Sequence, residues 1–90
     1  MALYNFTATI DLSATPKGRR LASWHISQGA GTQTVNFHNG NGGPIMFQVQ
    51  LPATTSASQA YDQAGMPVFT SGLYVEVVGT GLNAGCVDLV

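Results

Sequence analysis

The side chains that could bind a metal ion are few and lie far apart in this chain. The candidate ligands are His25, His38, Cys86 and Asp88, and none of them form the close pairs that are typical of zinc sites. Both histidines fall on the polar phase of their predicted strands, which favours exposed or edge positions. We therefore expect no metal ion and no other cofactor.

The residues that could catalyse a reaction form no recognisable constellation. Serine is plentiful, but the chain has no G-x-S-x-G sequence, and Cys86 lies in a predicted strand without a nearby base, as a small buried thiol. Glu76 is more simply a solvent-facing strand residue than half of an acid–base pair. The segment GTGLNAG at 79–85 has the wrong spacing for a phosphate-binding loop, and it is predicted to be a turn. The sequence thus predicts a protein that is not an enzyme.

Charge is scarce in this chain and apolar side chains are plentiful. Charged residues make up 8% of the 90 residues and hydrophobic residues 44%, and the net charge is −1. The apolar content is sufficient for a core, and the lack of a basic field argues against nucleic acid as a partner. No apolar run approaches the roughly 18 residues that span a bilayer, and the N-terminus lacks the features of a signal peptide. A single cysteine indicates folding in a reducing cytoplasm.

Alternation of apolar and polar side chains predicts β-strands along nearly the whole chain. Over 2–12, Tyr4, Phe6, Ala8 and Ile10 alternate with polar residues, which is the period that buries one face of a sheet. Comparable strands are predicted over 21–28, with Trp24 facing inward, over 32–39, with Phe37 facing inward, and over 45–51, 73–78 and 86–90. The segment 55–61 is predicted to be an edge strand, with a short helix over 56–63 as the alternative.

The turn signals between these strands indicate one small domain. NGNGG at 39–43 predicts a hairpin with a loop of four or five residues or a bulge, because Asn and Gly tolerate positive φ. Over 73–78 apolar side chains point to both faces, which is typical of a central strand or of one covered by a partner. The sequence predicts an all-β fold over residues 1–90, a compact antiparallel β-sandwich of about seven to eight short strands, jelly-roll-like or a small barrel.

Several segments recur together in one class of proteins. These are IMFQVQLPA at 45–53, a Ser/Thr-rich segment, GMPVF at 65–69, GLYVEVVGTG at 72–81 and a final strand; the segment from Arg19 to Gly43 also suits the pattern. In this order they resemble small proteins encoded among the structural genes of tailed bacteriophages.

The resemblance implies a virion building block, either a capsid decoration (cement) protein or a head or tail accessory protein. Such proteins commonly form symmetric oligomers, often trimers, so the implied partners are copies of the chain itself and the major capsid protein or another virion protein. No nucleic acid and no membrane would be bound, and the protein would be located in the virion after folding in the host cytoplasm. Low charge suits surfaces that a partner covers, and exposed strand edges permit strand addition between chains.

Three groups of residues are expected to contact partners, with an ordinary solvated end or loop as the alternative for each, an alternative that is favoured for the basic cluster. They are the N-terminal residues Ala2, Leu3 and Tyr4; the basic cluster Lys17, Arg19 and Arg20; and, in the loop from Pro52 to Tyr61, Thr54, Thr55 and Tyr61.

The alternative function is a glycan- or host-surface-binding module of a tail or head fibre. Carbohydrate sites usually place an exposed aromatic ring beside Asn, Asp or Gln side chains. Tyr61, Asp62 and Gln63 form the one such cluster that the sequence offers.

Overall fold

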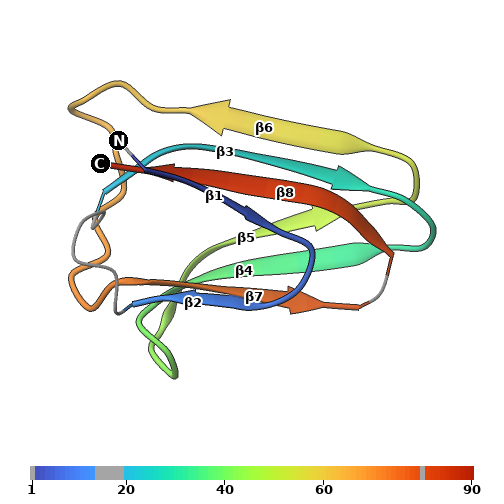
Figure 1. Cartoon of the computed structure of the whole chain (residues 1–90), viewed down its shortest axis with the longest axis horizontal. Helices are drawn as coiled ribbons and strands as arrows, with labels where there is room; N and C mark the ends of the chain where they lie inside the picture. The colour runs from blue at the N-terminus through green and yellow to red at the C-terminus, as the bar shows by residue number, and fades with distance from the viewer. Residues whose placement is uncertain (1, 14–19, 80) are drawn as a thin grey trace.

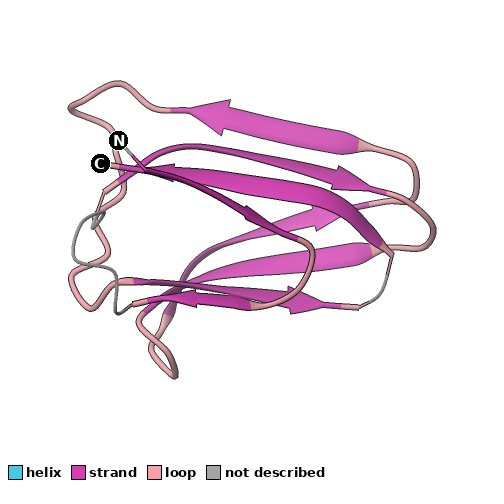
Figure 2. Ribbon diagram, viewed as in Figure 1, coloured by secondary structure: helices cyan, strands magenta, loops and turns pink. Residues whose placement is uncertain are grey.

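The computed structural model describes residues 2–13, 20–79 and 81–90, in which every regular element is a β-strand. Two four-stranded sheets pack face to face, as Figures 1 and 2 show, and every strand pair is antiparallel. The predicted all-β antiparallel sandwich is therefore confirmed. The eight strands are β1 (Ala2–Phe6), β2 (Ile10–Leu12), β3 (Leu21–Gln28), β4 (Gln33–Asn39), β5 (Ile45–Leu51), β6 (Ser56–Ala60), β7 (Leu73–Val78) and β8 (Leu82–Leu89).

The strand order is that of a jelly roll. Sheet A has the order β1-β8-β3-β6 and sheet B the order β2-β7-β4-β5. The first strand pairs with the last, the second with the seventh, the third with the sixth and the fourth with the fifth. The chain is thus a long antiparallel ribbon rolled into two sheets, the arrangement of jelly-roll domains. Among the described strands, β4 and β5 are the one consecutive pair that stays within a sheet.

The core lies between the two sheets and is lined by the apolar phase of each strand. Trp24 and Phe37, which share the phase of predicted core residues, are buried with ring centroids 6.0 Å apart. Phe47 stacks on Phe37 with ring centroids at 4.4 Å and an interplanar angle of 16°. Phe69, in the connection between β6 and β7, closes the core beside Phe47. The aromatic rings therefore join the two sheets, and their burial removes a large apolar area from water.

The hairpin and the edge strand predicted from the turn signals are both present. Residues 40–44 connect β4 to β5, Gly40 and Gly42 have φ of 87° and 81°, and a register shift follows Phe37. Strand β6 occupies the edge of sheet A within the segment predicted to be an edge strand. The alternative of a helix over 56–63 is wrong.

The single strand predicted over 2–12 is in fact two strands in different sheets. Strand β1 ends at Phe6 in sheet A and β2 begins at Ile10 in sheet B, while Ala8, predicted to face inward, is exposed. The main-chain N–H of Val77 donates to Thr9 Oγ1 at 3.0 Å and fixes this corner to β7. Apolar and polar residues continue to alternate with the same phase from β1 through the corner into β2. The periodicity therefore could not reveal that the chain changes sheet between them.

The turn predicted over 79–85 is also corrected, because β8 already begins at Leu82. Gly85 lies inside this strand, opposite Phe6 of β1. A Cβ atom at Gly85 would come within 2.6 Å of Phe6 Cζ. The glycine therefore makes room for the buried ring of Phe6. A sequence pattern cannot distinguish a glycine required for packing from a glycine required for a turn.

Candidate functional site

The edges of the two sheets are the first surfaces that could bind a partner. Strands β1 and β6 border sheet A, and β2 and β5 border sheet B. Strands β1, β5 and β6 contain no charged residue, whereas Asp11 lies in β2. An edge strand exposes unpaired N–H and C=O groups, and soluble proteins usually protect such edges with charged side chains or proline. These three uncharged edges can therefore accept an additional strand.

The predicted N-terminal contact residues all lie on the edge strand β1. Ala2, Leu3 and Tyr4 pair with Leu89, Asp88 and Val87 of β8. Leu3 points outward and is 64% exposed, whereas the ring of Tyr4 packs against the core. Leu3 therefore presents an exposed apolar side chain on this edge strand.

Of the predicted basic cluster, Lys17 and Arg19 lie outside the described residues. Arg20 is exposed and forms an isolated bridge with Val68. Its carbonyl accepts a hydrogen bond from the N–H of Val90 at 2.9 Å, near the end where both termini lie in Figure 1. Val68 and Val90 are themselves exposed apolar residues, so Arg20 stands in a partly apolar surface.

Thr54 and Thr55 lie in the β5–β6 loop at the opposite end of the sandwich. Thr54 has a φ of 59°, a conformation that is unusual for a β-branched residue. Its N–H donates to the carbonyl of Gly29 at 2.8 Å, and the carbonyl of Thr55 accepts from the N–H of Gln28 at 2.8 Å. The loop is therefore fixed to the neighbouring β3–β4 loop, and both threonine side chains are exposed.

Tyr61 is not the outward-facing ring that the sequence predicts. It is half-buried, packs against the core, and its hydroxyl accepts a hydrogen bond from Trp24 Nε1 at 3.2 Å. Asp62, beside it, accepts the N–H of Gly65 and forms a turn. Tyr61 thus satisfies the indole N–H of Trp24 at the margin of the core and does not form an exposed aromatic platform.

The outer face of sheet B carries a polar network that the sequence analysis missed. Asn36, in the middle of β4, is aligned with Gln48 of β5 and Glu76 of β7. Gln48 Nε2 donates to Asn36 Oδ1 at 2.7 Å, and Asn36 Nδ2 donates to Glu76 Oε1 at 2.9 Å. Gln50 extends the row by donating to Gln48 Oε1 at 3.2 Å. The network therefore runs across the three strands β5, β4 and β7.

His38 belongs to the same network and is not the exposed or edge histidine predicted. Its side chain is 14% exposed, because it lies on an inner strand with its ring edge-to-face with Tyr74. Nδ1 is 2.9 Å from the carbonyl oxygen of Gly43 and Nε2 is 3.0 Å from Glu76 Oε1. Since both neighbours are acceptors, both ring nitrogens must donate, and this requires the imidazolium form.

The pKa values of this pair shift accordingly. The Gly43 carbonyl, followed by Glu76, raises the pKa of His38 despite partial burial. The Asn36 amide, followed by His38, lowers the pKa of Glu76. Glu76 is at the outer face of its strand, as predicted. The alternation of polar residues placed Asn36 and His38 on one face, but their partners depend on strand register.

The other predicted chemical residues lie on the outer face of sheet A. His25 is exposed, as predicted, and Cys86, predicted to be a buried thiol, is half-buried beside it in the strand register. In the described part of the chain, no three His, Cys, Asp or Glu side chains gather in a way that could hold a metal ion.

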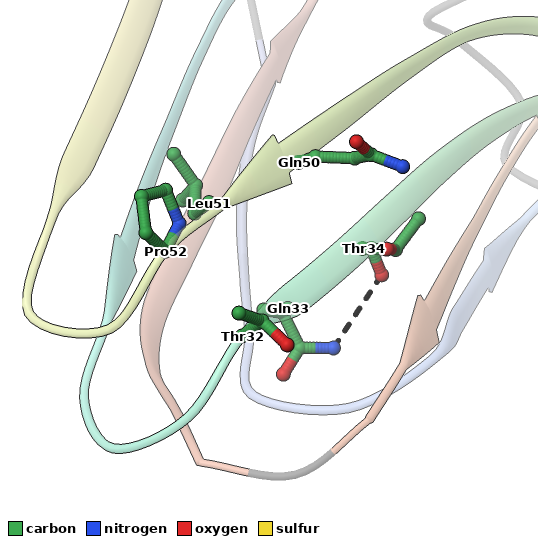
Figure 3. A pocket seen from close by; sticks show the side chains of 6 residues that line it. All are labelled: Thr32, Gln33, Thr34, Gln50, Leu51 and Pro52. Carbon is green, nitrogen blue, oxygen red and sulfur yellow. Dashed lines mark hydrogen bonds between the residues drawn. The ribbon is translucent and has the colours of Figure 1, made fainter.

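A hollow lies at one end of the β4–β5 pair, on the side of the molecule where β4 begins and β5 ends. It has a volume of about 470 Å³ and is lined by Thr32, Gln33, Thr34, Gln50, Leu51 and Pro52. Figure 3 shows these six side chains around the two strand ends. Gln33 is buried, and its carboxamide nitrogen donates to the carbonyl of Val78 on β7. The side chain of Gln33 in the wall of the hollow is therefore held in place by its hydrogen bond to β7.

The strand edges offer main-chain hydrogen-bonding groups beside exposed apolar side chains, and the polar network holds the β4–β5 loop through the hydrogen bond between His38 and Gly43. Within residues 2–13, 20–79 and 81–90, no helix has the length and apolarity to cross a membrane. Comparison with protein-family models, with curated proteins and with solved structures finds no match to this chain.

Proposed function

We propose that this chain is a non-enzymatic structural protein of a tailed-phage virion, a capsid decoration (cement) protein that binds and stabilises the capsid lattice. The observation that carries the proposal is the set of three uncharged strand edges on one small sandwich. An edge that is not blocked by charge favours binding of another extended segment. The resemblance of the sequence to phage structural proteins supports the same conclusion, whereas the fold alone does not decide it.

The proposed mechanism is bridging between capsid subunits. The partners are other copies of the chain and the major capsid protein, and the site of action is the virion, after folding in the host cytoplasm. Each edge contributes a modest contact, and many copies on one lattice bind together more strongly than one contact would. The lattice then resists the internal pressure of packaged DNA.

The proposal is tested by deleting the gene from the phage that carries it and challenging the purified particles with heat and low salt. Particles without the protein should release their DNA at a lower temperature, and the wild-type chain supplied in trans should restore their stability. Particles of unchanged stability would contradict the proposal.

Two charge variants sharpen this test. Leu3→Lys puts a charge on the uncharged edge strand β1, whereas Gln63→Lys puts the same charge on an exposed turn residue away from the strands. We expect Gln63→Lys to restore particle stability and Leu3→Lys to restore less of it. Equal restoration by both would contradict a role for the β1 edge.

A further inference from the structure

Among the residues that the structure describes, no strand pairs with the outer edge of β5. Strand β5 contains seven residues, IMFQVQL, and pairs with β4 on one side alone. None of its side chains is charged. A strand of this length, without charge along it, is a template for an antiparallel partner strand.

The two ends of β5 differ in a complementary way. At its beginning, Ile45 and Met46 are 50% and 47% exposed, which is unusual for two adjacent large apolar side chains. At its end, Gln50, Leu51 and Pro52 line the hollow of about 470 Å³. One end of β5 thus presents exposed apolar side chains, and the other end borders an open hollow.

From these observations we propose that β5 pairs antiparallel with β5 of a second copy of this chain, across a two-fold axis. The inference rests on the proposed function, since it names the partner of one of the edges that the function uses. Antiparallel pairing of identical strands brings the beginning of each to the end of the other. The contact is isologous, so the complementary ends meet twice.

The pleat of the strand selects the register. Residues directly opposite each other in an antiparallel pair point to the same face of the sheet. In β5, Phe47, Val49 and Leu51 pack toward the core, while Gln48 and Gln50 belong to the outer face. Over residues 47–51, odd-numbered residues must therefore face odd-numbered ones, and even-numbered residues even-numbered ones. A β-bulge breaks this alternation before Phe47 and puts Ile45 opposite His38, on the outer face. Among such two-fold registers, the one centred on Gln48 uses the whole strand, because it pairs Phe47 with Val49 across the axis and brings Ile45 and Met46, at the bulged end of each copy, beside Gln50 and Leu51 of the other.

In this register Met46 of one copy lies beside Gln50 of the other, at the strand end that lines the hollow. Adjacent strands are about 4.8 Å apart, so an extended methionine side chain reaches across one strand to the hollow. Ile45, on the outer face, lies near the Leu51 end of the other copy, and Gln48 lies on the axis opposite its own copy. The two sheets B then form one continuous sheet of eight strands.

The charges and the size of the contact indicate a weak, concentration-dependent dimer. Strand β5 contains no charged side chain, so no like charges meet across the axis. One strand of seven residues per copy is a small contact compared with stable protein interfaces. Such a contact is reinforced when many copies are held on one lattice.

Disulfide cross-linking of the full chain tests the register directly, in a Cys86→Ser background that leaves no native thiol. In the proposed register the cysteines of Gln48→Cys face each other across the axis, with Cα atoms about 4.5–5.5 Å apart, within disulfide range. The matched control is Gln50→Cys, whose two cysteines would be about 13 Å apart along the strands. Mild oxidation should give covalent dimer with Gln48→Cys and little with Gln50→Cys.

A charge-pair experiment tests the same register without cysteines. Met46→Lys should weaken self-association at least about tenfold in a light-scattering dilution series, since it puts a charge against the hollow. Adding Gln50→Glu should restore association, because each lysine then faces a glutamate of the other copy. Adding Gln48→Glu instead should not restore it. Circular dichroism spectra matching the wild type show that each variant has folded.

The outcomes separate this inference from the proposed function. Selective cross-linking of Gln48→Cys and rescue by Gln50→Glu support the β5 contact, whether or not capsids bind the protein. A monomer at every concentration, a trimer whose association is unchanged in Met46→Lys, or equal cross-linking of both cysteine variants would overturn it. Binding of the protein to capsids in any of those cases would leave the proposed function standing.

Discussion

At the scale of single residues, His38 fixes the β4–β5 loop to the outer face of sheet B. Its ring bridges the carbonyl of Gly43 and the carboxylate of Glu76. The raised pKa of His38 means that its contribution to stability is complete below its ordinary value of 6.5 and is lost as the pH rises through the folded-state value. The lowered pKa of Glu76 contributes stability above 4.5, which is lost as the pH falls through its folded-state value. Together they favour the folded state most between these two values.

The first prediction is a pH-dependent cost of His38→Gln. Glutamine is neutral and its donors share one nitrogen, so it cannot replace the charged contact with Glu76 while also bonding the Gly43 carbonyl as the imidazolium does. Thermal unfolding should therefore show a larger difference between wild type and variant at about pH 5 than at about pH 8. His25→Gln, at an exposed histidine of sheet A, is the matched control. An equal difference at both pH values would contradict the role assigned to His38.

The second prediction concerns the hydrogen bond between Trp24 and Tyr61. Tyr61→Phe keeps the ring packed against the core but leaves the indole N–H of Trp24 without its acceptor. We expect a loss of about 1 kcal/mol in the free energy of unfolding. Denaturant unfolding followed by tryptophan fluorescence measures it, since Trp24 is the single tryptophan of the chain. An unchanged free energy of unfolding would show that water replaces the hydroxyl at no cost.

The sequence predicted the burial of residues whose orientation follows from the alternation within their own strand. It missed the environment of residues whose partners lie on a strand distant in the sequence. Trp24 and Phe37 were placed in the core by phase alone, and both are buried. His38 was predicted to be an exposed or edge histidine. Its partner Glu76 is 38 residues away and becomes a neighbour only through the register of β4 and β7, which the sequence pattern does not reveal.

At the scale of elements, the loops at one end of the sandwich are held by main-chain hydrogen bonds. Gly29 donates to Gly81, Thr54 donates to Gly29, and Gln28 donates to Thr55. Three connections of the rolled ribbon thus support each other, and Thr54 keeps its positive φ within this arrangement.

The third prediction is that Thr54→Asn stabilises the protein. Asparagine tolerates the left-handed conformation better than a β-branched residue, and it retains the N–H that donates to Gly29. We expect a gain of about 0.5–1 kcal/mol in the free energy of unfolding, measured by chemical denaturation. The control, Thr54→Pro, removes that N–H and should destabilise the protein. A loss of stability in Thr54→Asn would contradict this explanation.

The elements themselves were predictable to different degrees. Strands β3, β4, β5 and β7 coincide closely with alternating segments, and the hairpin loop follows from its Asn and Gly residues. The corner between β1 and β2 was not predictable, because the same alternation serves both sheets. The start of β8 was missed since Gly85 is required by the ring of Phe6, a contact between opposite ends of the chain.

At the scale of the whole molecule, the low charge determines how copies can meet. The chain has seven charged residues, three basic and four acidic, and a net charge of −1. Association through uncharged edges depends on main-chain hydrogen bonds and apolar contacts, which salt screens little.

The fourth prediction is therefore that self-association responds weakly to salt. Between about 50 mM and 500 mM NaCl, we expect the dimer dissociation constant to change less than about threefold. Sedimentation equilibrium at several salt concentrations measures it. A steep loss of association with rising salt would indicate instead that charged side chains, such as those of the basic cluster Lys17, Arg19 and Arg20, carry the contact.

The central claim, that the protein decorates a capsid, is tested most directly by its copy number in particles. Quantitative mass spectrometry of purified phage particles should find this chain at a fixed molar ratio to the major capsid protein, because a lattice-binding protein occupies equivalent sites. The ratio should persist through repeated density-gradient purification. Absence of the chain from the particles, or only a few copies in each, would contradict the account.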